Sequence, residues 1–225
     1  MFLVWPFLSA ERAPAIIDAL VRRVRRVVYL SSLGVSDERD RQTDLINQFH
    51  ADLERLIKRS GLDWTMLRSS GFATNLYQWA PQIRDGDVVR APYARATRSL
   101  IDGRDIAGVA VRALVEGGHE AATYALTGPD SLTTVEQVQT IAQAIGRPLR
   151  VEERPPGEAR EQLLGWLPAD ADADGVLDVW ASFVTHPEPV TATVEEITGT
   201  PARSLHEWAL AHADAFRATP IRRTP

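Results

Sequence analysis

His50 and Glu54 stand four residues apart in FHADLERLIKRSG, a segment whose apolar residues recur with the period of a helix. This spacing places both side chains on one helical face, where an imidazole could donate a proton and a carboxylate could orient it. In the structural interpretation, His50 caps the polar side of the helix and Glu54 pairs with Lys58 one turn later. Such pairs are common on solvated faces, so the pattern favours the structural interpretation while the catalytic one stays open.

Polar residues follow two buried strands of the sequence. Ser31 and Ser32 end the first, in RRVVYLSSLGV, and the second is followed by Ser69, Gly71, Phe72 and Asn75. Doubly wound α/β proteins bind ligands at the carboxyl ends of their strands. The two serine hydroxyls could bind a cofactor phosphate, a ribose or a substrate carbonyl, or they could satisfy the loop backbone. Asn75 could bind a ligand or cap the helix that follows it.

Aromatic residues near the second strand end could line a pocket for a flat, quinone-like or flavin-like ring. They are Phe72, Tyr77 and Trp79. For each of them, core packing is the alternative role.

Strands and helices alternate through the first two thirds of the sequence. Apolar runs predict strands at residues 2–5, 27–30, 64–67, 88–89, 123–126 and 149–152. This order implies right-handed parallel crossovers, hence a three-layer, Rossmann-like α/β sheet in residues 1–150. Residues 151–225 are predicted to form a small, mainly helical lobe with three apolar anchors, Trp166, Trp180 and Phe183. The predicted helix signals are an N-cap at Ser9, a left-handed Gly61, and capping boxes at Thr133, Thr193 and Ser204.

The composition is that of an ordinary globular protein, with 44% hydrophobic and 24% charged residues among 225. A net charge of -5 provides no cationic surface, so we expect no nucleic-acid binding. The absence of cysteine excludes disulfides and cysteine metal sites and is consistent with a cytoplasmic protein. The five histidines follow no zinc-binding pattern, so no metal site is predicted. FLVWPFL is too short to span a bilayer, and no membrane association is expected.

Six segments, in this order, resemble a known family: FLVWP, RRVVYLSSLG, the H-x-x-x-E helix, SGLDWTMLRSSGFATN, RSLIDGRDIAGVAVRAL and YALTGPDSLTTVEQVQTIAQAIGRPL. Together they look like the NmrA-like branch of the atypical short-chain dehydrogenase/reductases, over nearly the whole chain. That branch includes NAD(P)H-dependent quinone and azo reductases. It also includes redox-sensing regulators that bind dinucleotide without turning over a substrate.

The resemblance implies that the family pattern starts before Phe2, which falls where the family has its fourth strand. No G-x-G-x-x-G or G-x-x-G-x-x-G loop occurs in the sequence, although such a loop holds the pyrophosphate in this fold. We therefore expect a partial NADP or NAD site, formed by Trp5, Pro6, Ser31, Ser32 and residues 69–75. We also expect an exposed strand edge at residues 2–5. A gene start at an internal methionine is the favoured explanation, and cover by a partner or a second copy is the alternative.

By resemblance, Ser31 or Ser32 matches the serine that classical members of the superfamily place after the fifth strand. His50 and Glu54 stand where those members have a Tyr-x-x-x-Lys pair, whose lysine lowers the pKa of the tyrosine. Ser32 and His50 are thus the catalytic candidates. The expected activity is hydride transfer from NAD(P)H to a small aromatic or quinone-like acceptor. The missing Tyr and Lys favour a non-catalytic dinucleotide sensor as the alternative, and an inactive truncated remnant is the third hypothesis.

Overall fold

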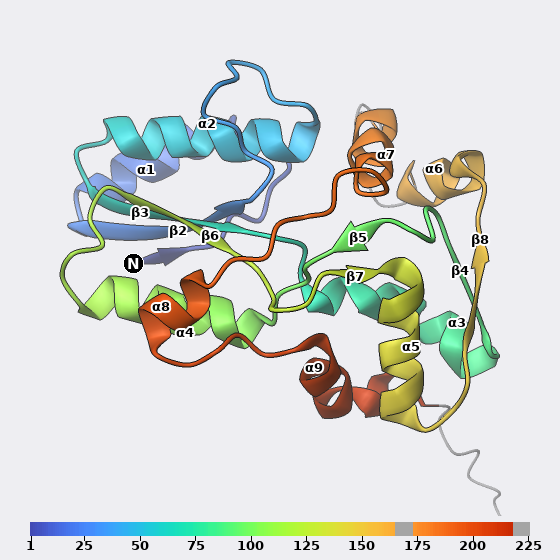
Figure 1. Cartoon of the computed structure of the whole chain (residues 1–225). Coiled ribbons are helices and arrows are strands. Elements are labelled where there is room, and N and C mark those ends of the chain that lie inside the picture. The colour runs from blue at the N-terminus through green and yellow to red at the C-terminus, as the bar shows by residue number, and fades with distance from the viewer. Residues whose placement is uncertain (165–172, 218–225) are drawn as a thin grey trace, which may run out of the picture.

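The computed structural model describes residues 1–164 and 173–217. Its central feature is a parallel sheet of four strands: β1 (Phe2–Leu3), β2 (Arg26–Ser32), β3 (Asp63–Ser69) and β6 (Ala122–Leu126), in that order. Helices α1 (Ala13–Val21) and α2 (Leu45–Arg59) cover one face, and α4 (Gly103–Val115) and α8 (Thr193–Thr198) cover the other (Figure 1). The predicted three-layer, Rossmann-like fold is confirmed.

Strand β2 is apolar on both faces because helices cover both. Val27 and Tyr29 pack in the core under α1 and α2, and Val28 packs in the core under α4. The parallel register with β3 places Ser32 opposite Ser69. The residues that follow these two strands therefore meet at one edge of the sheet.

Helix α2 begins at Asp44, whose carboxylate accepts hydrogen bonds from the backbone N–H groups of Ile46 and Asn47. Three residues of its apolar stripe reach the core: Phe49, Leu53 and Ile57. The chain leaves the helix through Gly61, whose φ of +80° confirms the predicted left-handed residue. The polar face of α2 remains available for the groups at the strand ends.

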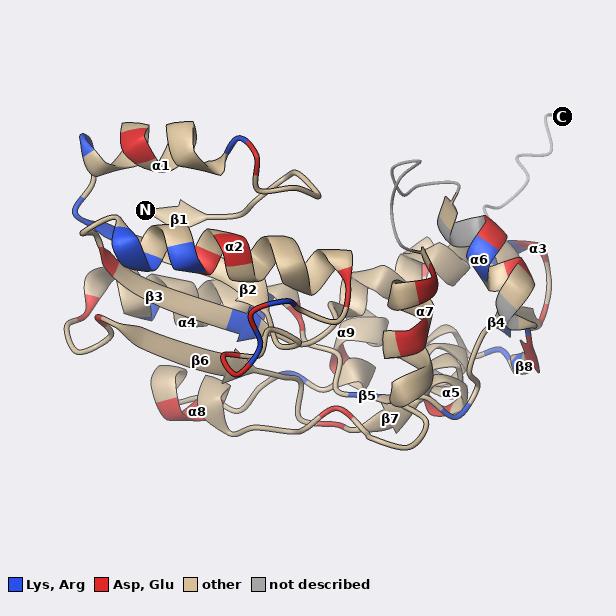
Figure 2. Ribbon diagram, turned by 90° about the horizontal axis from the view of Figure 1, so that it is seen from above, with Lys and Arg blue, Asp and Glu red and all other residues tan. Residues whose placement is uncertain are grey.

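The other described elements lie beyond the carboxyl ends of the main strands. They are η1 (Ala73–Trp79), α3 (Ala80–Asp85), β4 (Val88–Ala91), β5 (Thr97–Arg98), β7 (Leu132–Thr133), α5 (Thr134–Ile145), β8 (Arg150–Glu153), α6 (Pro156–Leu164), α7 (Ala173–Ser182), α9 (Leu205–Ala211) and η2 (Ala213–Ala215). One core centred on Trp208 and Phe216 joins α5 and α9. Helices α6 and α7 have a smaller cluster of their own, at the end toward which β2 and β3 point (Figure 2).

Several local predictions were wrong. The strand at β4 pairs with β8 in a separate two-stranded sheet and does not join the central sheet. Ser9 caps no helix, because α1 starts after Arg12 with Pro14 in its first turn. Thr193 is already inside α8, which begins after Ala192 without a side-chain cap. The capping boxes of Thr133 and Ser204 are confirmed, and Trp166 lies outside the described residues.

Strand β1 lies at an edge of the sheet and pairs with β2 alone. Val4, just after it, is 56% exposed. Within residues 1–164 and 173–217, no helix has the length and apolar character needed to cross a membrane.

Candidate functional site

A cavity of about 310 Å³ opens at the carboxyl ends of β2 and β3. The loops after these strands form one wall, the first turns of α2 another, and α7 stands across from them (Figure 1). The predicted site residues that line it are Ser31, Ser32, His50, Ser69, Gly71, Phe72 and Asn75. The parallel fold thus brings together most of the residues that the sequence singled out.

His50 is held by a buried tyrosine. The Tyr29 hydroxyl lies 2.6 Å from His50 Nδ1, and Tyr29 is fully buried. Burial, with the charge of Glu54, raises the pKa of Tyr29, so the hydroxyl stays protonated and needs an acceptor. Among the described residues, Nδ1 is its one hydrogen-bond partner. The tyrosine therefore donates to Nδ1, and the neutral imidazole carries its proton on Nε2.

The His50 ring is uncharged at neutral pH. Burial lowers the pKa of His50 to about 4, against smaller opposing effects of the Glu54 and Asp44 charges. A charged imidazolium is thus not available as the proton donor at pH 7. What the ring offers is Nε2–H, on the side away from Tyr29, and His50 lines the cavity.

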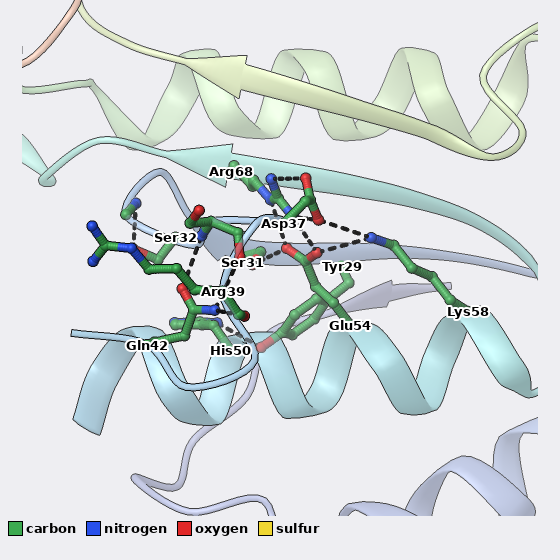
Figure 3. A network of polar contacts seen from close by, with 12 residues as sticks. Tyr29, Ser31, Ser32, Asp37, Arg39, Gln42, His50, Glu54, Lys58 and Arg68 are labelled. Carbon is green, nitrogen blue, oxygen red and sulfur yellow. Dashed lines mark hydrogen bonds and ion pairs between the residues drawn. The ribbon is translucent and has the colours of Figure 1, made fainter. Parts of the chain in front are cut away.

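Glu54 belongs to a buried ion-pair network and does not orient His50 (Figure 3). Its carboxylate is 2% exposed and accepts hydrogen bonds from Arg68 Nε at 3.0 Å and Nη2 at 2.7 Å. Ser31 Oγ donates to it at 2.6 Å, and Lys58 Nζ lies 3.3 Å away, as the structural interpretation predicts. Arg68 makes two further bonds of 2.7 Å with Asp37, in the loop before α2.

The same network sets the ionisation of Glu54. Burial alone would raise the pKa of this carboxyl, but hydrogen bonds from Arg68 and Ser31 outweigh it and hold the pKa below its ordinary value. A carboxylate that stays charged and fully bonded has no free lone pair to take a proton from a substrate. We assign Glu54 to joining α2, β3 and the Asp37 loop.

The serine hydroxyls at the strand ends are engaged within the protein. Ser31 Oγ donates to Glu54, and Ser32 Oγ donates to Asn47 Oδ1 at 2.7 Å. Ser69 Oγ donates to the Ser31 carbonyl at 3.3 Å. With their protons used in this way, these hydroxyls can accept a hydrogen bond from a ligand but do not donate one. Ser32 is therefore a weaker candidate for catalysis than the sequence suggested.

Trp5 and Pro6, predicted to contact the cofactor, do not line the cavity. The Trp5 indole packs under α1 beside Ile17, and its Nε1 donates to the Ser9 carbonyl at 3.0 Å. Pro6 is exposed. Burial of the large apolar ring in the α1 layer explains why Trp5 turns away from the strand ends.

The aromatic residues after β3 divide between two environments. Phe72 lines the cavity, and Trp79 lines a smaller cavity beside it. Tyr77 points elsewhere and packs on Trp208, with ring centroids 5.4 Å apart. The Asn75 side chain caps no helix, since η1 begins after Phe72 without a side-chain cap. Asn75 borders both cavities, which favours its ligand-binding interpretation.

Sequence reasoning missed the wall opposite the strand ends. Arg98 donates to the Glu188 carboxylate at 3.2 and 2.9 Å, and its guanidinium carbon lies 4.8 Å from the centroid of the Phe183 ring. No local pattern links residues that are ninety positions apart. Trp180 and Phe183, both predicted as apolar anchors, are three apart, and that spacing could have indicated a shared face.

Known proteins are similar over most of the chain. The model of an NAD(P)H-binding family matches residues 8–117. The chain is 38% identical over 193 residues to (4-alkanoyl-5-oxo-2,5-dihydrofuran-3-yl)methyl phosphate reductase of Streptomyces griseus, covering 86% of this chain and 68% of that protein. It is 32% identical over 224 residues to NAD(P)H azoreductase of Xenophilus azovorans, covering 97% and 77% respectively. The chain belongs to this NAD(P)H-binding, NmrA-like family.

Solved structures share the fold of this NmrA-like protein. The NADPH-dependent quinone oxidoreductase of Escherichia coli has a TM-score of 0.74 at 22% identity, covering 92% of this chain and 73% of that one. The triphenylmethane reductase of Citrobacter sp. has a TM-score of 0.69 at 14% identity, covering 89% and 69%.

In this family member, the cavity suits the nicotinamide and ribose end of a dinucleotide. The Asn75 amide offers donors, and the serine hydroxyls offer acceptors. Gly71 lets the loop lie against Arg98, because a Cβ there would come 2.5 Å from a guanidinium nitrogen. The described residues contain no glycine-rich loop for the pyrophosphate. The residues present therefore fit one end of the cofactor.

Proposed function

We propose that this chain takes part in hydride transfer from NAD(P)H to a flat, conjugated acceptor of the quinone type. One observation supports this most: a neutral His50, fixed by a buried Tyr29, lines a cavity whose walls include Phe72, Trp180 and Phe183. The printed names of its relatives, among them an azoreductase and a quinone oxidoreductase, agree with such an acceptor.

NAD(P)H, when bound, supplies the hydride. In this proposal, His50 Nε2–H donates a hydrogen bond to the acceptor oxygen, on which negative charge develops. A neutral imidazole is suited to this role because its orientation is fixed in advance by Tyr29. The aromatic side chains hold the acceptor ring by stacking and exclude water. The proton that completes the reduced product comes from solvent.

The test is NAD(P)H oxidation by the purified chain, with methyl-p-benzoquinone as the acceptor. His50→Phe removes the Nε2–H donor, so we expect kcat to fall about 100-fold, the usual cost of losing one such donor. The affinity for NADPH, measured by calorimetry, changes little. The matched control is His206→Phe, at an exposed histidine of α9. Equal rates for the two variants would remove His50 from the reaction.

A non-catalytic dinucleotide sensor is the second candidate, and one observation favours it. By resemblance, Glu54 stands in the place of the lysine of the classical pair, and its carboxylate is fully engaged with Arg68 and Ser31. A sensor binds NADPH or NADH and oxidises neither in the presence of quinones. Calorimetry and the turnover assay on the same preparation separate the two functions, and a chain that binds neither dinucleotide would contradict both.

A further inference from the structure

A second cavity of about 80 Å³ adjoins the cavity at the carboxyl ends of β2 and β3. The two cavities share four lining residues, Asn75, Arg98, Trp180 and Phe183, so they meet at one junction. A site for one water needs about 10–15 Å³, so the second cavity has room for about five heavy atoms. His50 lines the larger cavity and not the second one.

The second cavity is suited to an apolar occupant. Most of its lining is aliphatic or aromatic, including Leu76, Trp79, Ala91, Tyr93, Ala96 and Leu100. Two of its polar side chains donate within the protein: Thr134 Oγ1 donates to the Tyr93 carbonyl, and Gln137 Nε2 donates to the Leu132 carbonyl. A polar group placed against the aliphatic and aromatic part of this lining would lose its water without gaining a hydrogen-bond partner.

One side of the junction between the cavities, at Arg98, is held in place by hydrogen bonds. Glu188, which is 7% exposed, holds the Arg98 guanidinium by two hydrogen bonds and also accepts one from the Ser99 N–H at 3.1 Å. The guanidinium stacks over Phe183. A ligand that crosses the junction therefore passes a fixed planar wall, which favours a planar group followed by a narrow chain.

We propose that the acceptor carries an apolar alkyl substituent of about five carbons, which occupies the second cavity while its ring lies beside His50. This inference rests on the proposed function and names the substrate class: a conjugated carbonyl ring with a short alkyl tail. Each buried methylene contributes about 0.8 kcal/mol, which corresponds to about fourfold in affinity.

The experiment compares p-benzoquinones that carry a methyl, propyl or pentyl group. The chain has no cysteine, so these quinones cannot alkylate a thiol. Affinity is measured by quenching of tryptophan fluorescence, because Trp79 and Trp180 line the second cavity. KM is measured separately from NADPH oxidation. We expect both Kd and KM to fall about fourfold per added methylene.

The decisive variant is Ala96→Leu, which fills the second cavity; Ala94→Leu, in the same turn but outside both cavities, is its control. Thermal melts establish that both variants fold. Ala96→Leu should abolish the dependence on chain length, whereas Ala94→Leu keeps it. An affinity that ignores chain length, or an equal dependence in both variants, overturns the tail site. Chain-length-dependent quenching without turnover would keep the tail site and refute only the proposed reduction.

Discussion

Replacement of Glu54 by Gln tests how strongly the buried network holds the site together. The substitution keeps the shape of the side chain and removes the charge that pairs with Arg68, whose own side chain is 10% exposed. Removing one partner of a buried ion pair costs about 3–5 kcal/mol. Because Arg68 keeps both of its bonds to Asp37, we expect the lower end, about 3 kcal/mol.

Urea denaturation followed by tryptophan fluorescence measures this loss. For a chain of this length, 3 kcal/mol corresponds to a decrease in Tm of about 6–12 °C. The matched control is Glu38→Gln, at an exposed residue of the neighbouring loop, for which we expect a change within about 0.5 kcal/mol. The double variant Glu54→Leu with Arg68→Met should regain much of the stability, because no buried charge is left unpaired.

The pH dependence of the same variant follows from linkage. The folded pKa of Glu54 lies below the unfolded value near 4.5, so its stabilising contribution is fully present above that value. The contribution is lost as pH falls through the folded pKa. The difference between the wild type and Glu54→Gln should therefore shrink in acid. A loss below about 1 kcal/mol at pH 7, in the range of exposed pairs, would refute the view of a buried, stabilising pair.

Three other predictions concern the crevice. Burial lowers the pKa of His50 to about 4 in the folded chain, whereas its pKa is near 6.5 in the unfolded chain. The unfolded state therefore takes up the proton first as the pH falls. Between pH 7 and 5, the stability of the wild type should fall by about 2 kcal/mol more than that of His50→Gln. A proton NMR titration that places the His50 pKa above 6 would contradict this. Tyr29→Phe frees Nδ1 of His50, and we expect kcat for quinone reduction to fall about tenfold. The control is Tyr124→Phe, which lies on the α4 side of the sheet and should keep its activity. Gly71→Ala pushes the Arg98 guanidinium away from Glu188 and should cost about 1–3 kcal/mol of stability by overpacking. The control is Gly86→Ala, where a Cβ meets nothing within 4 Å, so its stability should be nearly unchanged. Equal melting temperatures for the two variants would refute the overpacking.

One wall of the larger cavity could be predicted from the sequence, because parallel pairing brings the carboxyl ends of neighbouring strands to the same edge of the sheet. Ser32 and Ser69 come from distant segments, but each ends a buried strand, and parallel pairing sets them opposite each other. The shared helical face of His50 and Glu54 was correct for the same kind of reason, a period of 3.6 residues.

The partners of those two residues could not be predicted. Glu54 accepts a hydrogen bond from Arg68 of β3, and His50 is hydrogen-bonded to Tyr29 of β2. Both contacts depend on how α2 is rotated and set along the sheet, which the periodicity leaves undetermined. The prediction for Trp5 was wrong for a different reason. A position next to the carboxyl end of a strand does not determine where a large aromatic side chain packs.

Among the described residues, helix α7 rests on a small cluster of buried side chains, Ala159, Ala173, Val176 and Leu177, with Leu8 and Ile46 packed between it and the core under α1 and α2. Segments with so small an apolar anchor open at a lower free energy than the rest of a domain. Helix α7 and the residues after it supply Trp180 and Phe183 to both cavities. Local opening of α7 would therefore give bulky molecules a route inward while the strands stay folded, and it would be seen as faster amide exchange in α7 than in β2. The pace of such openings, rather than the chemistry beside the imidazole, would then limit how quickly long-tailed compounds exchange.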